Sequence, residues 1–320
     1  NKTVVTEFIL LGFGNGLELD SFLFLIFLSI YIAIITGNIF IIVLRVVNQH
    51  LHTPMYFFLG NLACLEICYY SNILPRTLLS YLDGEKNISV NECFTQYYFF
   101  GCLAAAECYL LAVMSYDRYL AVCKPLRYPS RMNGKLCLQL GAVSWISGIL
   151  SNSILTFLIS NLDFCGPNEM EHFFCDSFPM IKLSCSDTHV IEHFFCDITP
   201  ILDLVCSDTY IFKLLVFIAT LIIILIPFIL IAASYIQIIH TILQMPSAEG
   251  RRKAFFTCNA HLVVVTLFYC TTGLVHLKAK SSLLAKSRKL MALSYTVVTP
   301  MLNPIIYTLR NKEVNHALKK

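Results

Sequence analysis

The chain has 320 residues, of which 57% are hydrophobic and only 13% are charged, and its mean hydropathy is +0.69. A soluble domain is closer to half apolar and a quarter charged. This composition therefore excludes a water-soluble domain with a single hydrophobic core and indicates a membrane protein. The net charge of +3 is too small to indicate binding to nucleic acid. The length suits one helical bundle over residues 1–320, without a second sizeable domain.

Several apolar runs are long enough to cross a bilayer as α-helices. They cover Ser21–Val47, Met55–Tyr81, Phe94–Val122, Leu136–Ser160, Asp208–His240, Lys253–Leu277 and Lys289–Leu309. Slightly more than half of the lysines and arginines fall on the side of the carboxyl terminus. This bias is modest, and the sequons and outer cysteines described below favour the same orientation, with the carboxyl terminus in the cytoplasm. The sequence therefore predicts an all-α membrane protein, a seven-transmembrane helix bundle in which residues 1–20 and the loop 160–207 lie outside. Residues 310–320 lie inside as a short amphipathic helix.

Two glycosylation sequons fall on the predicted outer side, Asn1-Lys2-Thr3 and Asn87-Ile88-Ser89. Such sequons are common by chance and matter only on an outer segment. We therefore expect Asn1 and Asn87 to be the acceptors of this chain.

Two glutamates lie in the middle of apolar runs, Glu66 in the second and Glu107 in the third. A carboxyl in lipid must be protonated, paired or bound to a cation, and such positions usually carry a function. The plainer alternative is a pair of protonated carboxyls that are bonded to neighbouring helices. No nucleophile or metal set accompanies them in the sequence, which argues against acid–base catalysis and against an enzyme.

Small and aromatic residues in the outer half of the third run predict a cavity. Phe100, Ala104 and Cys108 share one helical face, and Gly101 and Ala105 lie beside it. No acid lies in this outer half, so a cationic amine would lack a counter-ion. The alternative is close packing between helices, which also favours glycine and alanine.

Residues of two other runs reach a similar depth and complete the candidate ligand contacts. These are Ala219 and Thr220 of the fifth run and Tyr269, Thr272 and His276 of the sixth. The result is a mostly apolar cavity with a few hydroxyls, which suits a small, weakly polar ligand.

Asp117 and Arg118 close the third run, and a basic loop with Pro125 follows at once. An acid beside an arginine at the end of a span can form a local ion pair that holds two conformations apart. The alternative is a solvated helix end, because exposed ion pairs contribute little.

The long outer loop contains an internal repeat. Glu171–Val190 recurs as Glu192–Ile211, with 12 of 20 positions identical. Six cysteines lie on the outer side, and an even number in an oxidising compartment implies disulfides, with 15 possible pairings. They are Cys93, Cys165, Cys175, Cys185, Cys196 and Cys206. Metal binding is the rival interpretation, because His172 and His193 each precede a cysteine by three residues.

Several short sequence motifs of the chain resemble those of the olfactory receptors, the odorant branch of the rhodopsin-like G-protein-coupled receptors. They are VTEFILLGF at Val5–Phe13, PMYFF at Pro54–Phe58, MSYDRYLAVC at Met114–Cys123, HFFCD at His172–Asp176, KAFFTC at Lys253–Cys258 and PMLNPIIYTLRN at Pro300–Asn311. The resemblance implies a multi-pass receptor of the plasma membrane for a small hydrophobic odorant, with membrane lipid around it. It further implies a heterotrimeric G protein of the stimulatory, olfactory type, which raises cyclic AMP.

The resemblance also implies roles for single residues. It pairs Cys93 with Cys175 and Cys165 with Cys185, which leaves Cys196 for Cys206. Because the family carries one unit of the loop repeat, Cys93–Cys196 is a competing pair. The same resemblance implies a sodium ion at Glu66 and Glu107. The activation switch that it implies consists of Asp117, Arg118, Tyr235, His261, Asn303, Pro304 and Tyr307.

The resemblance also implies how this activation switch works. Arg118 pairs with Asp117 at rest, Pro304 permits a kink, and activation swings the sixth helix outward. Pro125, Leu126, Arg127 and Tyr128 are then expected contacts of the G protein. The alternatives are that His261 is an ordinary core residue, that the ligand is a lipid or a peptide, or that the chain is a membrane transporter, which would need a continuous polar path.

Overall fold

The computed structural model describes residues 5–13, 17–162, 164, 168–170, 172–183, 208–276 and 303. Long helices dominate this part of the chain. They are α1 (Leu17–Val47), α2 (Pro54–Leu82), α3 (Val90–Cys123), α5 (Gly134–Ser160), α9 (Asp208–Gln244) and α10 (Ala248–His276). Shorter elements are β1 (Glu7–Leu10), β2 (Asn87–Ser89), β3 (Glu169–Met170), α4 (Tyr128–Arg131), α6 (Ser177–Lys182) and the 3-10 turns Gln49–Leu51 and Pro125–Arg127.

Six helices of the described residues are long and apolar enough to cross a membrane, and they coincide with the first six predicted spans. Their outward faces carry large exposed apolar side chains such as Phe22, Leu138 and Ile236, as expected for helices that contact lipid. The predicted seventh span, residues 289–309, lies outside the described residues except for Asn303, which is buried and helical.

Local sequence explains where several helices begin. Ser89 caps α3 by accepting a hydrogen bond from the backbone of Glu92, and the Glu92 carboxylate accepts one from the Ser89 backbone in return. Asn133 caps α5 in a similar way through the Leu136 amide. Pro54 occupies the first turn of α2, where its missing N–H costs nothing.

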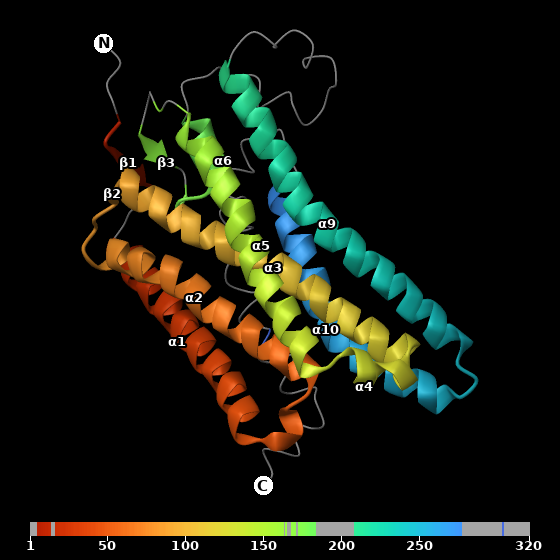
Figure 1. Ribbon diagram of the computed structural model, residues 1–320. Coiled ribbons are helices and arrows are strands. Elements are labelled where there is room, and N and C mark those ends of the chain that lie inside the picture. The colour runs from red at the N-terminus through yellow and green to blue at the C-terminus, as the bar shows by residue number, and fades with distance from the viewer. Residues whose placement is uncertain are drawn as a thin grey trace.

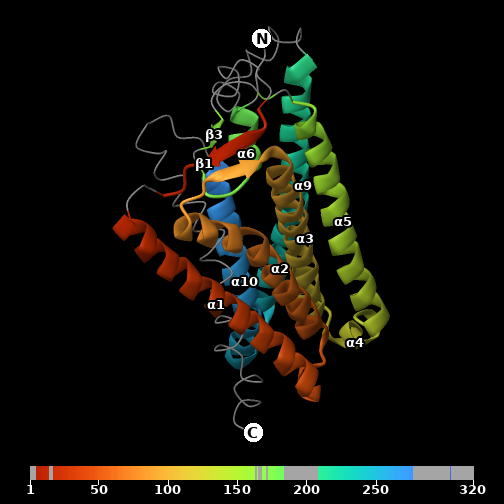
Figure 2. The same ribbon diagram turned by 90° about the vertical axis from the view of Figure 1, so that its left-hand side faces the viewer.

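α3 is the central helix of the described bundle. It packs against α2, α5 and α9, and Figures 1 and 2 show it crossing between them. At its closest point to α5, a Cβ on Gly148 would lie 2.6 Å from the backbone nitrogen of Ala106 and 2.6 Å from the carbonyl oxygen of Cys102. Only glycine lets the two backbones approach so closely, so the small residues here serve packing as well as the cavity.

A three-stranded sheet closes one end of the bundle and was not predicted from the sequence. β1 lies in the middle, antiparallel to β2 with Glu7 opposite Ser89, and parallel to β3 with Ile9 opposite Glu169. Figure 2 shows β1, β3 and α6 gathered at this end, far from α4. The sheet joins the amino-terminal segment to the start of α3 and to the long loop. The fold is therefore mostly helical rather than all-α.

Candidate functional site

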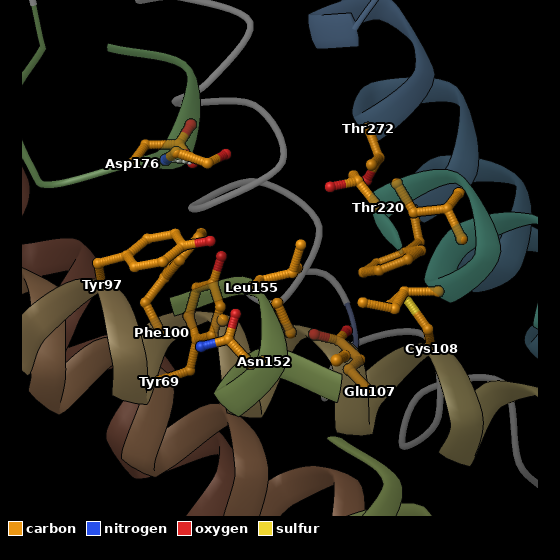
Figure 3. A pocket seen from close by; sticks show the side chains of 17 residues that line it. Tyr69, Tyr97, Phe100, Glu107, Cys108, Asn152, Leu155, Asp176, Thr220 and Thr272 are labelled. Atoms are coloured by element: carbon orange, nitrogen blue, oxygen red, sulfur yellow. Dashed lines mark hydrogen bonds between the residues drawn. The ribbon is translucent and has the colours of Figure 1, made fainter. Parts of the chain in front are cut away.

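A cavity of about 130 Å³ lies between the helices in the half of the bundle next to the sheet (Figure 3). Its walls come from α2, α3, α5, α6, α9 and α10. The lining residues are Tyr69, Tyr97, Phe100, Gly101, Ala104, Ala105, Glu107, Cys108, Asn152, Leu155, Asp176, Ser177, Thr220, Ile223, Ile224, Phe268 and Thr272. Most of this surface is apolar, with polar atoms at a few points.

Most of the ligand contacts proposed from sequence lie in this wall. The structure places Phe100, Gly101, Ala104, Ala105, Cys108, Thr220 and Thr272 there. Ala219 instead packs beside the neighbouring apolar cluster, and the ring of Tyr269 packs against Phe228 and Phe268. The side chain of His276 lies outside the described residues, although its backbone ends α10.

Several lining residues were missed by the sequence analysis, among them Tyr69, Tyr97, Asn152, Asp176 and Ser177. Asn152 carries the clearest signal, since it is the one carboxamide in the outer half of its apolar run, between Ser151 and Ser153. Its amide donates to the Tyr98 carbonyl at 2.8 Å, and a Cβ on Gly101 would lie only 2.2 Å from its side-chain oxygen. Gly101 is therefore small because Asn152 occupies the adjoining space.

The expectation that a cationic amine would find no acid is wrong. The cavity extends below the outer half of α3 and reaches Glu107, which is only 6% exposed. Asp176 lines it as well, where its carboxylate accepts a hydrogen bond from the Ser177 backbone at 2.7 Å and begins α6. Figure 3 shows these two carboxylates at separate points of the wall.

The disulfide Cys93–Cys175 fixes the long loop over the cavity and confirms the predicted pair. The Cys175 backbone amide donates to the Gln96 side-chain oxygen at 3.0 Å, so α3 holds the loop at a second point. Because the thiol of Cys175 is consumed, the metal interpretation is wrong for His172 and Cys175. The His172 ring instead stacks on Phe173 with a centroid distance of 4.9 Å.

Glu66 is buried and bonded from two sides. Its carboxylate accepts a hydrogen bond from the Asn38 amide at 2.9 Å and another from the Asn303 amide. Asn38 also donates to the Ile34 carbonyl at 3.1 Å, so the polar break in the first span is satisfied. These bonds tie α1, α2 and the segment at Asn303 together in the middle of the bundle.

Glu107 differs from Glu66, because its Oε1 atom is buried without a hydrogen-bond partner. The side-chain oxygen of Asn303 is also buried without a hydrogen-bond partner. Among the residues that the structure describes, no group of three His, Cys, Asp or Glu side chains is arranged to hold a metal ion.

At the other end of the bundle, Asp117 and Arg118 form a buried ion pair. The Arg118 Nε atom donates to Asp117 Oδ2 at 3.0 Å, and Tyr128 donates through its hydroxyl to Asp117 Oδ1 at 2.9 Å. The interpretation as a solvated helix end is wrong, since Asp117 is fully buried. Burial, followed by the charge of Asp117, raises the pKa of Tyr128, so this phenol stays a neutral donor at physiological pH.

A second polar contact joins α9 to α10 nearby. The hydroxyl of Tyr235 lies 2.7 Å from His261 Nδ1 and also donates to the Cys258 carbonyl at 3.4 Å. Both rings are buried and stacked on each other. Pro304 and Tyr307, which complete the predicted switch, lie outside the described residues.

Asn87 is exposed on β2, beside Glu7 of β1. The remaining outer residues of the sequence analysis, Asn1, Cys165, Cys185, Cys196 and Cys206, lie outside the described residues. The same holds for His193, for residues 192–207 of the second copy of the repeat and for the predicted carboxyl-terminal helix 310–320.

The helical fold, the loop disulfide and the buried Asp117–Arg118 pair define a seven-transmembrane receptor of the rhodopsin type. The profile of the family described as 7 transmembrane receptor (rhodopsin family) matches residues 37–307. The chain is 47% identical to human olfactory receptor 10A4 and 46% identical to human olfactory receptor 10A7, over all of this chain and 95% of each relative. It is 43% identical to mouse olfactory receptor 5AP2, over all of this chain and 94% of that relative. The chain belongs to the olfactory receptors of this family, which are multi-pass membrane receptors rather than enzymes.

Proposed function

We propose that this receptor binds a small, mostly apolar odorant in the cavity between α3, α5, α9 and α10. The observation that carries the proposal is the cavity itself, which is lined on its outer side by Asp176 and Ser177 of a disulfide-anchored loop. Ligand sites of this kind are largely preformed, apolar and supplied with a few polar groups. Affinity in such a site comes mainly from apolar burial, so we expect modest affinity and broad tuning.

We propose that binding is read at the inner end through α10. Phe268 and Thr272 line the cavity, while His261 on the same helix bonds to Tyr235 near Arg118. An outward movement of α10 would break the Tyr235–His261 contact and expose Arg118 to a partner. We propose that this partner is a stimulatory G protein of the olfactory type, so that the signal is a rise in cyclic AMP.

The inner loop offers a surface for that partner. Leu126 is 96% exposed between Pro125 and Arg127, so its apolar side chain is available for contact with another protein. Tyr128 is committed to Asp117 by its hydrogen bond. The proposed role of Tyr128 is therefore to hold the resting Asp117–Arg118 pair. The proposed contacts of the G protein are Pro125, Leu126 and Arg127.

We propose that Glu66 and Glu107 share a sodium ion in the resting receptor. The fit rests on two free acceptors, Glu107 Oε1 and Asn303 Oδ1, which lie buried without partners. Hard cations of this kind prefer carboxylate and amide oxygens. Sodium-dependent thermal stability that is lost in Glu107→Leu and kept in a control such as Glu92→Gln would support the site.

The proposed orientation puts the sheet end outside the cell. The Cys93–Cys175 disulfide and the exposed sequon at Asn87 lie at that end, and both suit the secretory route. The pairs Cys165–Cys185 and Cys196–Cys206, and glycosylation at Asn1, stay predictions of the same orientation.

The experiment is a cyclic AMP assay in cells that express the chain, with surface staining and a panel of small odorants. Arg118→Ala removes the switch arginine, and a second version lacks Glu192–Ile211. A response that disappears in Arg118→Ala at equal surface staining supports the proposal. A response that survives this substitution would contradict the switch. Staining that appears only after the deletion would show that the second repeat copy prevents the fold.

A further inference from the structure

We propose that the polar end of the cavity is built for a hydroxyl group, so that the receptor selects small neutral alcohols and phenols. This inference rests on the proposed function, because it assigns the ligand class of the same cavity. It comes from the buried hydrogen-bonding groups that the protein itself leaves without partners in the wall. The sodium ion proposed above would occupy Glu107 only in the resting receptor, and the ligand hydroxyl would take its place there.

Thr272 is the first of these groups. The other threonines of α10, Thr257, Thr266 and Thr271, each donate their hydroxyl to the carbonyl four residues earlier, at 2.7–2.8 Å. Thr272 makes no such bond, and its Oγ1 atom is buried without a partner. A buried hydroxyl without a partner is costly, so a threonine that does not satisfy itself in this way is positioned for a ligand.

Glu107 is the second group. It lines the same cavity, and its Oε1 atom is also buried without a partner. A carboxyl group has an oxygen with free lone pairs whether it is ionised or protonated. A protonated carboxyl can also donate through its O–H. A ligand hydroxyl satisfies Glu107 in either state because it both donates and accepts, whereas a ketone or an aldehyde can only accept and a hydrocarbon can do neither.

The two groups face the cavity from opposite helices, α3 and α10, on the side where Figure 3 also shows Cys108 and Thr220. A ligand hydroxyl can donate to Glu107 and at the same time accept from Thr272. The hydroxyl of Thr220 donates to the Val216 carbonyl at 2.8 Å, so it is left as a further acceptor. One hydroxyl thus serves both Glu107 and Thr272, and the buried hydroxyl of Tyr269 on α10 is a further polar group near Glu107.

The remaining wall sets the body of the ligand. A cavity of about 130 Å³ is slightly smaller than an apolar cavity of about 150 Å³ that holds a benzene ring. The rings of Phe100 and Phe268 and the side chains of Leu155 and Ile223 line it. A protonated amine could pair with Glu107 or Asp176, but desolvating both charges of such a pair costs more than burying a neutral hydroxyl. The class that fits is one small ring or short chain with a single hydroxyl.

The test is binding to the purified full-length receptor in lipid nanodiscs, followed by ligand-dependent thermal shift. The probes share one ring and one carbon and differ only in the polar group: benzyl alcohol, benzaldehyde, benzylamine and toluene. We expect benzyl alcohol to bind at least tenfold more tightly than benzaldehyde or toluene, which is the ratio that one added hydrogen bond of about 1.4 kcal/mol supplies. Equal affinity of alcohol and toluene, or preference for the amine, would overturn the inference.

Two matched variants locate the effect. Thr272→Val keeps the shape of the side chain and removes its hydroxyl, so it should weaken benzyl alcohol about tenfold and leave toluene unchanged. Thr271→Val is the control, because that hydroxyl is already bonded within α10 and does not line the cavity. Toluene binding reports whether each variant is folded. An alcohol preference that survives in Thr272→Val would refute the assignment.

The two proposals can fail separately. If benzyl alcohol is preferred in nanodiscs but no odorant raises cyclic AMP, the ligand class stands and the G-protein assignment fails. If odorants raise cyclic AMP but the alcohol preference is absent, the receptor function stands and this inference is overturned. Binding of none of the four probes also overturns it, since the cavity would then not hold a ring of this size.

Discussion

Gly148→Ala tests the close approach of α3 and α5 on which the cavity depends. The added methyl would lie 2.6 Å from Ala106 N, 2.6 Å from Cys102 O and 2.7 Å from the Ala106 methyl group. Carbon atoms pack at about 3.5–4.0 Å, so the two helices must separate by roughly 1 Å at this point. Two of the three neighbours are backbone atoms, which cannot turn aside as a side chain could.

The expected cost follows from overpacking a closed interface, about 1–3 kcal/mol of unfolding free energy. The displaced turn of α3 carries Ala105 and leads into Glu107, both of which line the cavity. Ligand affinity should therefore fall together with stability. Thermal unfolding of the purified receptor in detergent, with and without a bound ligand, measures both effects.

Gly134→Ala on the same helix is the matched control. A Cβ at Gly134 would meet nothing within 4 Å, and the residue sits in the first turn of α5. Alanine there should be neutral or should stabilise by about 0.4–1 kcal/mol, because it reduces the freedom of the unfolded chain. If Gly148→Ala unfolds at the same temperature as the parent chain, the two backbones do not approach as described and the reasoning is refuted.

Three further substitutions test the loop disulfide, the buried Asp117–Arg118 pair and the hydrogen bonds of Glu66. Cys175→Ser opens a loop with a sequence separation of 82 residues and should cost roughly 4 kcal/mol by loop entropy, so surface staining should fall sharply; unchanged staining would contradict this. Tyr128→Phe removes the hydroxyl donor of Asp117 and should weaken the resting state by about 1–2 kcal/mol, seen as higher cyclic AMP without ligand. That increase should be independent of pH between about 6 and 8, because the raised pKa of Tyr128 keeps the phenol protonated throughout, and its contribution would be lost only at more alkaline pH. Asn38→Leu leaves Glu66 with one donor fewer and should lower thermal stability by about 1–3 kcal/mol, whereas an unchanged midpoint would show that the bond contributes nothing.

The six membrane spans that the structure describes could be predicted from the sequence because their apolar composition decides them. Their ends could not be placed as well. α3 begins at Val90 rather than Phe94, because the capping pair of Ser89 and Glu92 starts the helix before the apolar run does. α9 continues to Gln244, past the expected end at His240.

The sheet at the outer end escaped prediction for a different reason. Its strands are two to four residues long, and β1 pairs with residues far away in the chain. No periodicity marks segments so short, and their pairing is decided by tertiary position. Part of the cavity wall could not be predicted either, because Tyr69, Asn152 and Asp176 come from three different elements that only the tertiary structure brings together. The Cys93–Cys175 pair was predictable only through the family resemblance, because the six outer cysteines leave many pairings open.

The spacing of the functional residues on α3 and α10 shows why a cavity and a distant inner surface can act together. Glu107 and Arg118 are eleven residues apart on α3, which is close to three helical turns, so they share a face about 16 Å apart. Thr272 and His261 have the same separation on α10, which is antiparallel to α3. Each helix thus presents one group to the cavity and one to the inner contacts. A ligand hydroxyl held between Glu107 and Thr272 would change the distance between the two helices at the cavity. Because α10 is stiff over three turns, the same change reaches the Tyr235–His261 contact, where the helix is bonded to α9.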